Sequence, residues 1–143
     1  MTRAALKSPL RGGMGWAAVL LAGCHAPSAT LRPVCASNDA PAVGLVVSYT
    51  SRPYPQLRLR FERPLGELAG KRVEITGPGT RDAHAQWCGT GDDCRPPRSA
   101  GVTFGSLARD SSVSVRVDAV LPDGKPMHAE PVAKWKGETL ACG

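Results

Sequence analysis

The stretch that decides the fold class is Val-Ser-Val-Arg-Val-Asp-Ala, residues 113–119. Apolar and polar residues alternate strictly along it. Because successive side chains of a β-strand point to opposite faces of a sheet, this alternation indicates a strand with one buried and one solvated face. Pro122-Asp-Gly124 follows almost at once and is typical of a turn. We therefore expect β-structure here, with one face in water.

Shorter period-two patterns lie on both sides of this stretch. Pro131 falls inside the last of them and indicates an edge or a bulge there. Residues 65–69 are compatible with one helical turn, and the sequence has no longer helical stripe. The pattern is that of an all-β sandwich. The segments that we expect to form strands are 43–49, 57–62, 72–75, 83–87, 102–104, 113–119 and 127–135.

Residues 102–135 resemble the last strands of a fibronectin type III domain. That family shows a Leu, a Tyr six residues later, alternating Val residues and a turn with Gly. The matching positions here are Leu107, Val113 (in place of Tyr), Val115, Val117 and Gly124. Residues 59–64 resemble the family's strand that ends in an aromatic residue and Pro, with Phe61 where the family has Trp. The resemblance implies one immunoglobulin-like sandwich of about seven strands over residues 43–143, and no particular activity.

The N-terminus has the composition of a secretion signal. Residues 1–13 carry three basic residues and no acid, and residues 14–22 are apolar. The tetrad Leu21-Ala22-Gly23-Cys24 resembles a bacterial lipobox. This resemblance implies a diacylglycerol on the Cys24 thiol and cleavage before Cys24, so that 1–23 is a signal peptide. An ordinary signal peptide or a short N-terminal helix is the alternative. Residues 24–42, rich in Ala, Pro and Ser, are then expected to form the lipidated Cys and a flexible tether.

Cleavage changes the charge of the protein. The full chain has 18 basic and 12 acidic residues and a net charge of +6. Loss of Arg3, Lys7 and Arg11 leaves 15 basic against 12 acidic residues, so the net charge falls to +3. Together with secretion, this argues against a nucleic-acid partner. No apolar run reaches the roughly 18 residues of a membrane-spanning helix, so the expected membrane contact is the N-terminal lipid.

Five cysteines become an even set of four when Cys24 carries lipid. In an oxidising compartment four cysteines indicate two disulfides, with three possible pairings. We favour Cys35–Cys142, which joins the two ends of the domain, and Cys88–Cys94, which closes a short Gly-containing loop. A zinc site at Cys88, Cys94 and His84 is the alternative, although five residues between the cysteines is a wide spacing for zinc.

The candidate binding residues are two arginines and two aspartates. Arg58 and Arg60 share one face of an expected strand, where they suit phosphates or an acidic partner; a solvated strand face is the plain alternative. Asp92 and Asp93 lie in the Cys88–Cys94 loop. Two adjacent carboxylates are too few for calcium, which takes six or more oxygens, so we expect a contact point at most.

The sequence contains no motif that indicates catalysis or a cofactor. His25, His84 and His128 are isolated, and there is no Gly-x-Ser-x-Gly nucleophile elbow. We therefore expect a non-enzymatic lipoprotein of the cell envelope that docks an envelope protein or a glycan. A purely structural or stress-related lipoprotein is the second hypothesis, and a small hydrolase or metal-binding protein is the third.

The residue after Cys24 bears on the expected location. In lipoproteins of enteric-type bacteria, which this N-terminus resembles, Asp at that position keeps the protein at the inner membrane. His25 stands there instead. If the source is Gram-negative, we therefore expect the outer membrane, with the domain facing the periplasm.

The lipobox generates a direct prediction. Replacing the only thiol that can carry the lipid, in Cys24→Ser, should abolish incorporation of labelled palmitate and move the protein from the membrane to the soluble fraction. The wild-type chain expressed at the same level is the control. Palmitate incorporation into the Cys24→Ser variant would contradict the lipobox interpretation.

Overall fold

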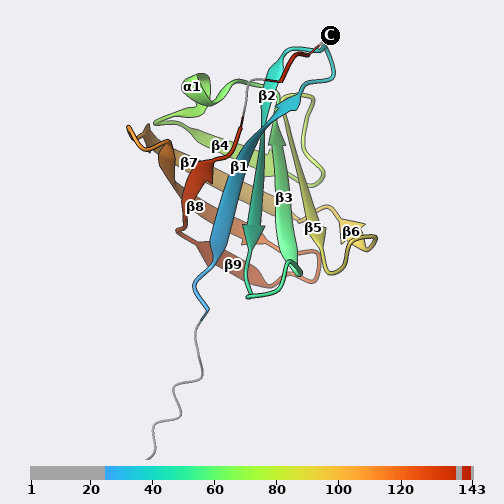
Figure 1. Cartoon of the computed structure of the whole chain (residues 1–143). Helices are drawn as coiled ribbons and strands as arrows, with labels where there is room; N and C mark the ends of the chain where they lie inside the picture. Colours follow the sequence, from blue (N-terminus) through green and yellow to red (C-terminus); the bar gives the residue numbers. More distant parts are fainter. Residues whose placement is uncertain (1–24, 138–139, 143) are drawn as a thin grey trace, which may run out of the picture.

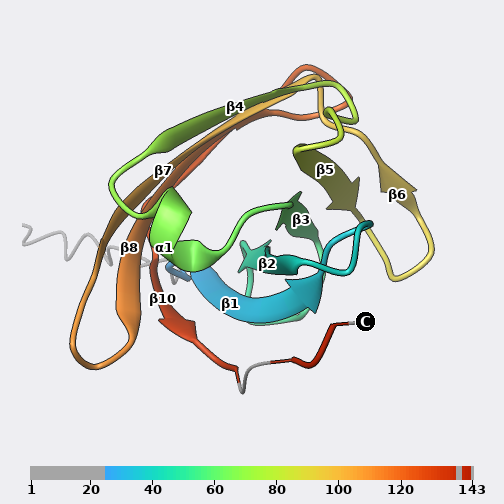
Figure 2. The same ribbon diagram turned by 90° about the horizontal axis from the view of Figure 1, so that it is seen from above.

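The computed structural model describes residues 25–137 and 140–142. It is an all-β structure in which ten strands form one strongly curled mixed sheet, a half-barrel around a single core (Figures 1 and 2). The one helix within the described residues, α1 (Leu65–Leu68), lies over the end of the sheet that is uppermost in Figure 1. The strands are β1 (Ser28–Cys35), β2 (Pro41–Ser48), β3 (Gln56–Phe61), β4 (Arg72–Thr76), β5 (Ala83–Cys88), β6 (Cys94–Arg95), β7 (Ser99–Leu107), β8 (Ser112–Val120), β9 (Pro126–Ala129) and β10 (Val132–Trp135).

The strand order is β4-β7-β8-β10-β1-β2-β3-β5-β6, with β9 paired to β8 beside β10. All pairs are antiparallel except β1 with β10. Because β10 pairs with β8 on one side and with β1 on the other, the two halves are one continuous sheet. The expected two-sheet immunoglobulin-like sandwich is therefore wrong. Alternation specifies which face of a strand is buried, and it is the same in a sandwich and in a curled sheet.

Six of the seven expected segments each form one strand, and the helical turn forms as α1, whereas the segment 127–135 forms two strands, β9 and β10. The edge or bulge expected at Pro131 is wrong, because β10 pairs on both sides and β9 and β10 keep one unshifted register with β8. β9 and β10 both lie along the same side of β8, and the strand is interrupted between them at residues 130–131. The chain stays close to β8 through the interruption, because the Val115 N–H donates to the Pro131 carbonyl at 2.9 Å.

The expected tether is corrected by β1, which occupies Ser28–Cys35 within residues 24–42. β1 pairs along its whole length with β2 and at Thr30 and Leu31 with β10. Only one of its side chains, Leu31, is fully buried. A strand held by ladders on both sides needs no alternating pattern of its own, which is why the sequence does not reveal it.

Phe61 and Phe104 are the largest fully buried side chains and pack edge to face, with ring centroids 5.1 Å apart. They come from the two opposite walls of the half-barrel and are surrounded by Val and Leu from the inner faces of both. Leu65 and Leu68 of α1 are buried against this core. Tyr49 and Trp87 pack against it with ring centroids 5.6 Å apart, and burial raises the pKa of Tyr49 to about 12, with a further contribution from Asp118.

Both disulfides form in the favoured pairing. Cys35–Cys142 connects the end of β1 to the C-terminal segment, with a Cα–Cα distance of 5.6 Å. Cys88–Cys94 joins β5 to β6 across their turn. Since Cys88 and Cys94 are bonded to each other, the alternative zinc site is not formed. Among residues 25–137 and 140–142, no helix has the length and apolar character needed to cross a bilayer.

The two disulfides should differ in their contribution to stability. In the chain-entropy treatment, closing the 107-residue separation of Cys35–Cys142 is worth about 5 kcal/mol, and closing the six-residue separation of Cys88–Cys94 about 2 kcal/mol. We expect paired Cys→Ala replacement at 35 and 142 to lower the free energy of unfolding more than the same change at 88 and 94, as measured by urea denaturation. The reverse order would contradict this.

Candidate functional site

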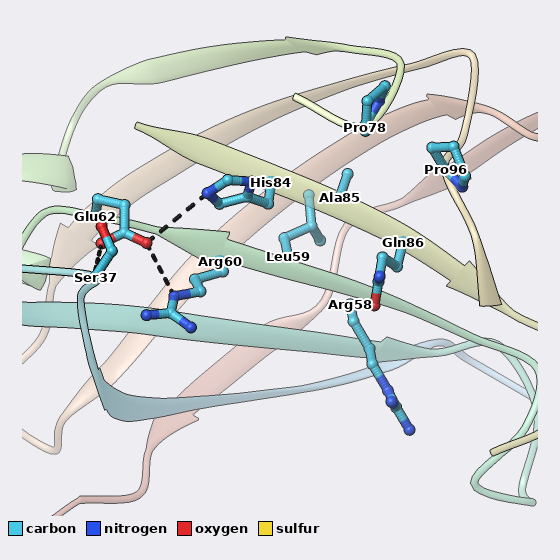
Figure 3. Close-up of a pocket in the computed structure, with 10 residues that line it drawn as sticks. All are labelled: Ser37, Arg58, Leu59, Arg60, Glu62, Pro78, His84, Ala85, Gln86 and Pro96. Atoms are coloured by element: carbon cyan, nitrogen blue, oxygen red, sulfur yellow. Dashed lines mark hydrogen bonds and ion pairs between the residues drawn. The ribbon is translucent and has the colours of Figure 1, made fainter. Parts of the chain in front are cut away.

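The candidate site is an open groove of about 580 Å³ on the outer face of β3 and β5 (Figure 3). The inward side chains of β3 fill the core, so Arg58, Arg60 and the following Glu62 project outward. The register pairs Arg58 with Gln86 and Arg60 with His84. Pro78 and Pro96, from the segments beside β5, also line the groove.

Glu62 is the electrostatic centre of one end of this groove, and its side chain is only 10% exposed. One carboxylate oxygen accepts the Ser37 N–H at 3.0 Å. The other lies 3.0 Å from Arg60 Nε, an ion pair outside hydrogen-bond geometry, and 3.8 Å from His84 Nε2. Arg60 also donates to the Cys35 carbonyl. The Arg60 guanidinium is therefore fixed between the end of β1 and Glu62.

Arg58 is fixed at the other end of the groove. Its Nη2 donates to the Tyr54 hydroxyl at 2.7 Å, and its guanidinium carbon lies 5.7 Å from the centroid of the Tyr54 ring. With the Gln56 amide turned so that its oxygen faces Arg58, that oxygen accepts from Nε at 2.6 Å and from Nη2 at 2.7 Å. Both groove arginines are thus held in place before any ligand arrives.

The structure brings some of the sequence-predicted residues together and separates others. Arg58 and Arg60 share the outer face of β3, as their spacing predicts. The Cys88–Cys94 loop approaches the Arg58 end, where a Cβ on Gly91 would lie 3.3 Å from the Tyr54 hydroxyl. Asp92 and Asp93 do not line the groove. Asp93 lies 3.5 Å from Arg95 in an exposed ion pair.

Three groove residues are absent from the sequence-based candidates as binding residues: Glu62, His84 and Gln86. The alternation in 57–62 already puts Arg58, Arg60 and Glu62 on one face of their strand. The alternation in 83–87 likewise puts His84 and Gln86 on one face of theirs. The missing information is that β3 pairs with β5 and not with β4. In the part of the chain that the structure describes, no three His, Cys, Asp or Glu side chains gather as metal ligands would.

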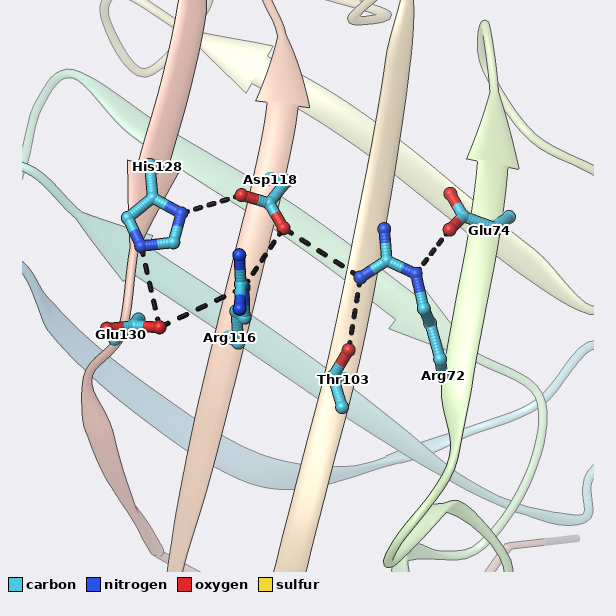
Figure 4. A network of polar contacts seen from close by, with 7 residues as sticks. All are labelled: Arg72, Glu74, Thr103, Arg116, Asp118, His128 and Glu130. Atoms are coloured by element: carbon cyan, nitrogen blue, oxygen red, sulfur yellow. Dashed lines mark hydrogen bonds and ion pairs between the residues drawn. The ribbon is translucent and has the colours of Figure 1, made fainter.

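A second polar cluster lies on the outer face of β4, β7, β8 and β9 (Figure 4). Asp118 is at its centre. His128 Nδ1 lies 2.6 Å from Asp118 Oδ1, and Arg116 Nε lies 3.3 Å from Oδ2. These contacts lower the pKa of Asp118, and the hydrogen bond with His128 has the largest effect. Glu130 lies 3.6 Å from His128 Nε2 and 3.8 Å from Arg116 Nε.

Gly101 makes room for Arg72 of β4 to join this cluster. The register aligns Glu74, Gly101 and Asp118 across β4, β7 and β8. A Cβ on Gly101 would lie 2.3 Å from Arg72 Nη2, so the Arg72 side chain occupies the space that a larger residue would fill. Arg72 pairs there with Glu74, donates to Thr103 at 3.1 Å and lies 3.8 Å from Asp118. The cluster satisfies its own charges and links four strands, so we assign it a structural role.

The chain matches no protein-family model, no curated protein and no solved structure. The groove on β3 and β5 is therefore interpreted from its own geometry.

The Asp118 cluster generates a prediction about pH. The folded-state pKa of Asp118 is lowered. The ionised carboxylate therefore stabilises the fold fully above the unfolded-state pKa of about 4, and this stabilisation is lost as the pH falls through the folded-state pKa. Asp118→Asn should lower the free energy of unfolding by roughly 0.5–1 kcal/mol at pH 7, as for exposed ion pairs. The difference should shrink as the pH falls below about 4 and should be smaller at pH 3 than at pH 7.

Urea denaturation at the two pH values checks this prediction. Asp92→Asn is the matched control, since Asp92 is exposed and has no ion pair within the described residues. A difference between wild type and Asp118→Asn that stays constant from pH 7 to pH 3 would show that the carboxylate charge is not the cause.

Proposed function

We propose that this protein is an exported, lipid-anchored, non-enzymatic binding module of the cell envelope, and that its groove on β3 and β5 receives an acidic segment of a partner protein. The observation that carries the proposal is the unequal exposure of charge in the groove. The side chains of Arg60 and His84 are 43% and 48% exposed, whereas that of Glu62 is 10% exposed. A ligand in the groove therefore meets cationic and neutral donors, while the carboxylate is covered.

The fixed positions of the arginines support binding in a second way. Association costs conformational entropy when long side chains must be ordered, and a preorganised surface avoids part of that cost. Arg60 is held by Glu62 and the Cys35 carbonyl, and Arg58 by Tyr54. Positive charge in a concave surface also raises the rate at which an acidic partner is met.

The shape of the groove favours a protein partner over a glycan or another small ligand. Small-molecule sites are mostly apolar clefts with aromatic walls that bury most of the ligand. This groove is open, its lining contains no Phe, Tyr or Trp, and the nearby Tyr54 ring already faces Arg58. An extended acidic segment can lie along the row of donors, with Pro78 and Pro96 beside it.

Export and anchoring rest on separate support. Two disulfides are typical of proteins from oxidising compartments. The lipobox-like tetrad at residues 21–24 supplies the anchor in this proposal and lies outside the described residues. With His25 after Cys24, the proposed location in a Gram-negative source is the outer membrane, with the domain in the periplasm. No nucleic acid is involved.

A photo-crosslinking amino acid at two positions tests the groove in cells. Gln86 is exposed within the groove, and Ser114 is exposed on β8, outside it. We expect the probe at Gln86, but not at Ser114, to form one reproducible adduct with an envelope protein. Combined Arg58→Gln and His84→Gln should reduce that adduct about tenfold, as loss of roughly 1.4 kcal/mol would, and added NaCl should weaken it.

The matched control is Arg116→Gln, which removes an exposed arginine of the Asp118 cluster and should leave the adduct unchanged. Equal adducts from Gln86 and Ser114 would contradict the proposal, and so would an adduct indifferent to the Arg58 and His84 changes. A Gln86 adduct with a glycan in place of a protein would overturn the choice of partner.

A further inference from the structure

We propose that the end of the half-barrel formed by the β2–β3 loop, residues 49–55, lies against phospholipid headgroups, with Arg52 contacting their phosphates. This inference rests on the proposed lipid anchor at Cys24. It adds which end of the domain meets the membrane and which way the groove then points.

The first step is the length of chain between the anchor and the sheet. Three residues, 25–27, separate Cys24 from Ser28, the first residue of β1. Four Cα steps span roughly 14 Å at full extension. The headgroup layer of one leaflet is itself about 5–8 Å thick. The beginning of β1 therefore cannot stand far from the headgroups of the membrane that holds the lipid.

The second step is the register, which fixes what lies at the same end as Ser28. Ser28 pairs with Ser48, and Ser48 pairs with Gln56, so the loop between β2 and β3 projects beyond this row. Figure 1 shows this loop at the lower end of the barrel, where the chain enters β1. At the opposite end, Cys35 pairs with Pro41, and the turn 36–40 lies beside the Cys35–Cys142 disulfide. Eight residues of β1, about 23 Å, separate the two ends.

The third step is the chemistry of the loop. Residues 49–55 contain one basic residue, Arg52, and no acid, and Arg52 has no ion pair in the part of the chain that the structure describes. The Thr50 hydroxyl accepts the Arg52 N–H at 3.2 Å and lies 3.1 Å and 3.2 Å from the Arg52 and Tyr54 carbonyls. The loop thus presents an exposed arginine on a tied backbone. A cationic residue of this kind suits the phosphates of the headgroup layer.

This orientation has a consequence for the groove. The Arg58 end, held by Tyr54, lies towards the membrane, and the Glu62 end, held by the Ser37 N–H of the far turn, lies away from it. The groove therefore opens sideways along β3, and a partner reaches it parallel to the membrane surface.

The test uses the full-length, lipidated protein in vesicles of zwitterionic and anionic phospholipids. The native cysteines of the mature chain carry lipid or form disulfides, so an added cysteine provides a single free thiol. Ser51→Cys, in the loop, and Ser37→Cys, in the far turn, are a matched pair of exposed serines. Each is labelled with the same fluorophore, and quenching by a headgroup-nitroxide phospholipid is measured.

We expect the label at position 51 to be quenched at least threefold more than the label at position 37. Arg52→Gln should lower the quenching at position 51 by half or more in anionic vesicles, whereas Arg63→Gln, just beyond the other end of β3, should not. Equal quenching at both positions, or stronger quenching at 37, would overturn the orientation. An Arg52→Gln variant that behaves like wild type would overturn the phosphate contact.

Vesicle flotation separates this inference from the proposed function. A protein that fails to float with the vesicles lacks the anchor, and the proposed lipid-anchored function fails with it. A protein that floats but shows the wrong quenching order is anchored in another orientation, and only the present inference fails.

Discussion

The double pairing of β10 holds the two walls of the half-barrel together in one sheet. Its Lys134 pairs with Ser112 of β8 on one side and with Thr30 of β1 on the other. Without these two ladders, β4, β7 and β8 would form one sheet, and β1, β2, β3 and β5 another. With them, the two walls are one surface that curls around Phe61 and Phe104. Backbone hydrogen bonds in β10 thus set the shape that the buried side chains then fill.

The groove is a consequence of how the chain leaves that sheet and returns to it. After β3, residues 62–82 form α1 and β4, and β4 joins the far edge of the sheet beside β7. β5 then returns to pair with β3. This detour brings Arg60 opposite His84, which follows it by 24 positions, and leaves the turn containing Pro78 beside them. The candidate site therefore exists because β4 is not the neighbour of β3.

The two polar clusters show how similar residue types serve different ends. Around Asp118, cations and carboxylates are all exposed and paired with one another across four strands, which suits mutual attachment of the strands. In the groove, the carboxylate of Glu62 is covered, while the cations around it remain partly open to solvent. The two clusters contain similar residue types and differ in the exposure of their carboxylates. Only in the groove is the carboxylate covered, so that the cations beside it are available to a partner.

The strands whose own residues alternate, from 43–49 to 127–135, follow from the sequence alone, because one buried face requires that pattern. The shared face of Arg58 and Arg60 also follows from the sequence, because the two residues are two positions apart on one strand. The even set of four cysteines indicated the two disulfides. Each of these properties depends on residues close together in the chain or on their number.

The tertiary fold is needed to know which strands are neighbours. In the fold, residues 28–35 form β1 through ladders with β2 and β10, although their sequence shows no strand pattern. The two sheets expected from the sequence are one sheet. The fold also places His84 and Gln86 beside Arg60 and Arg58, and covers Glu62 with the Ser37 turn. The physical reason is that backbone hydrogen bonds between strands are the same for every residue except proline. Side-chain alternation therefore specifies which face of a strand is buried and leaves its partner open.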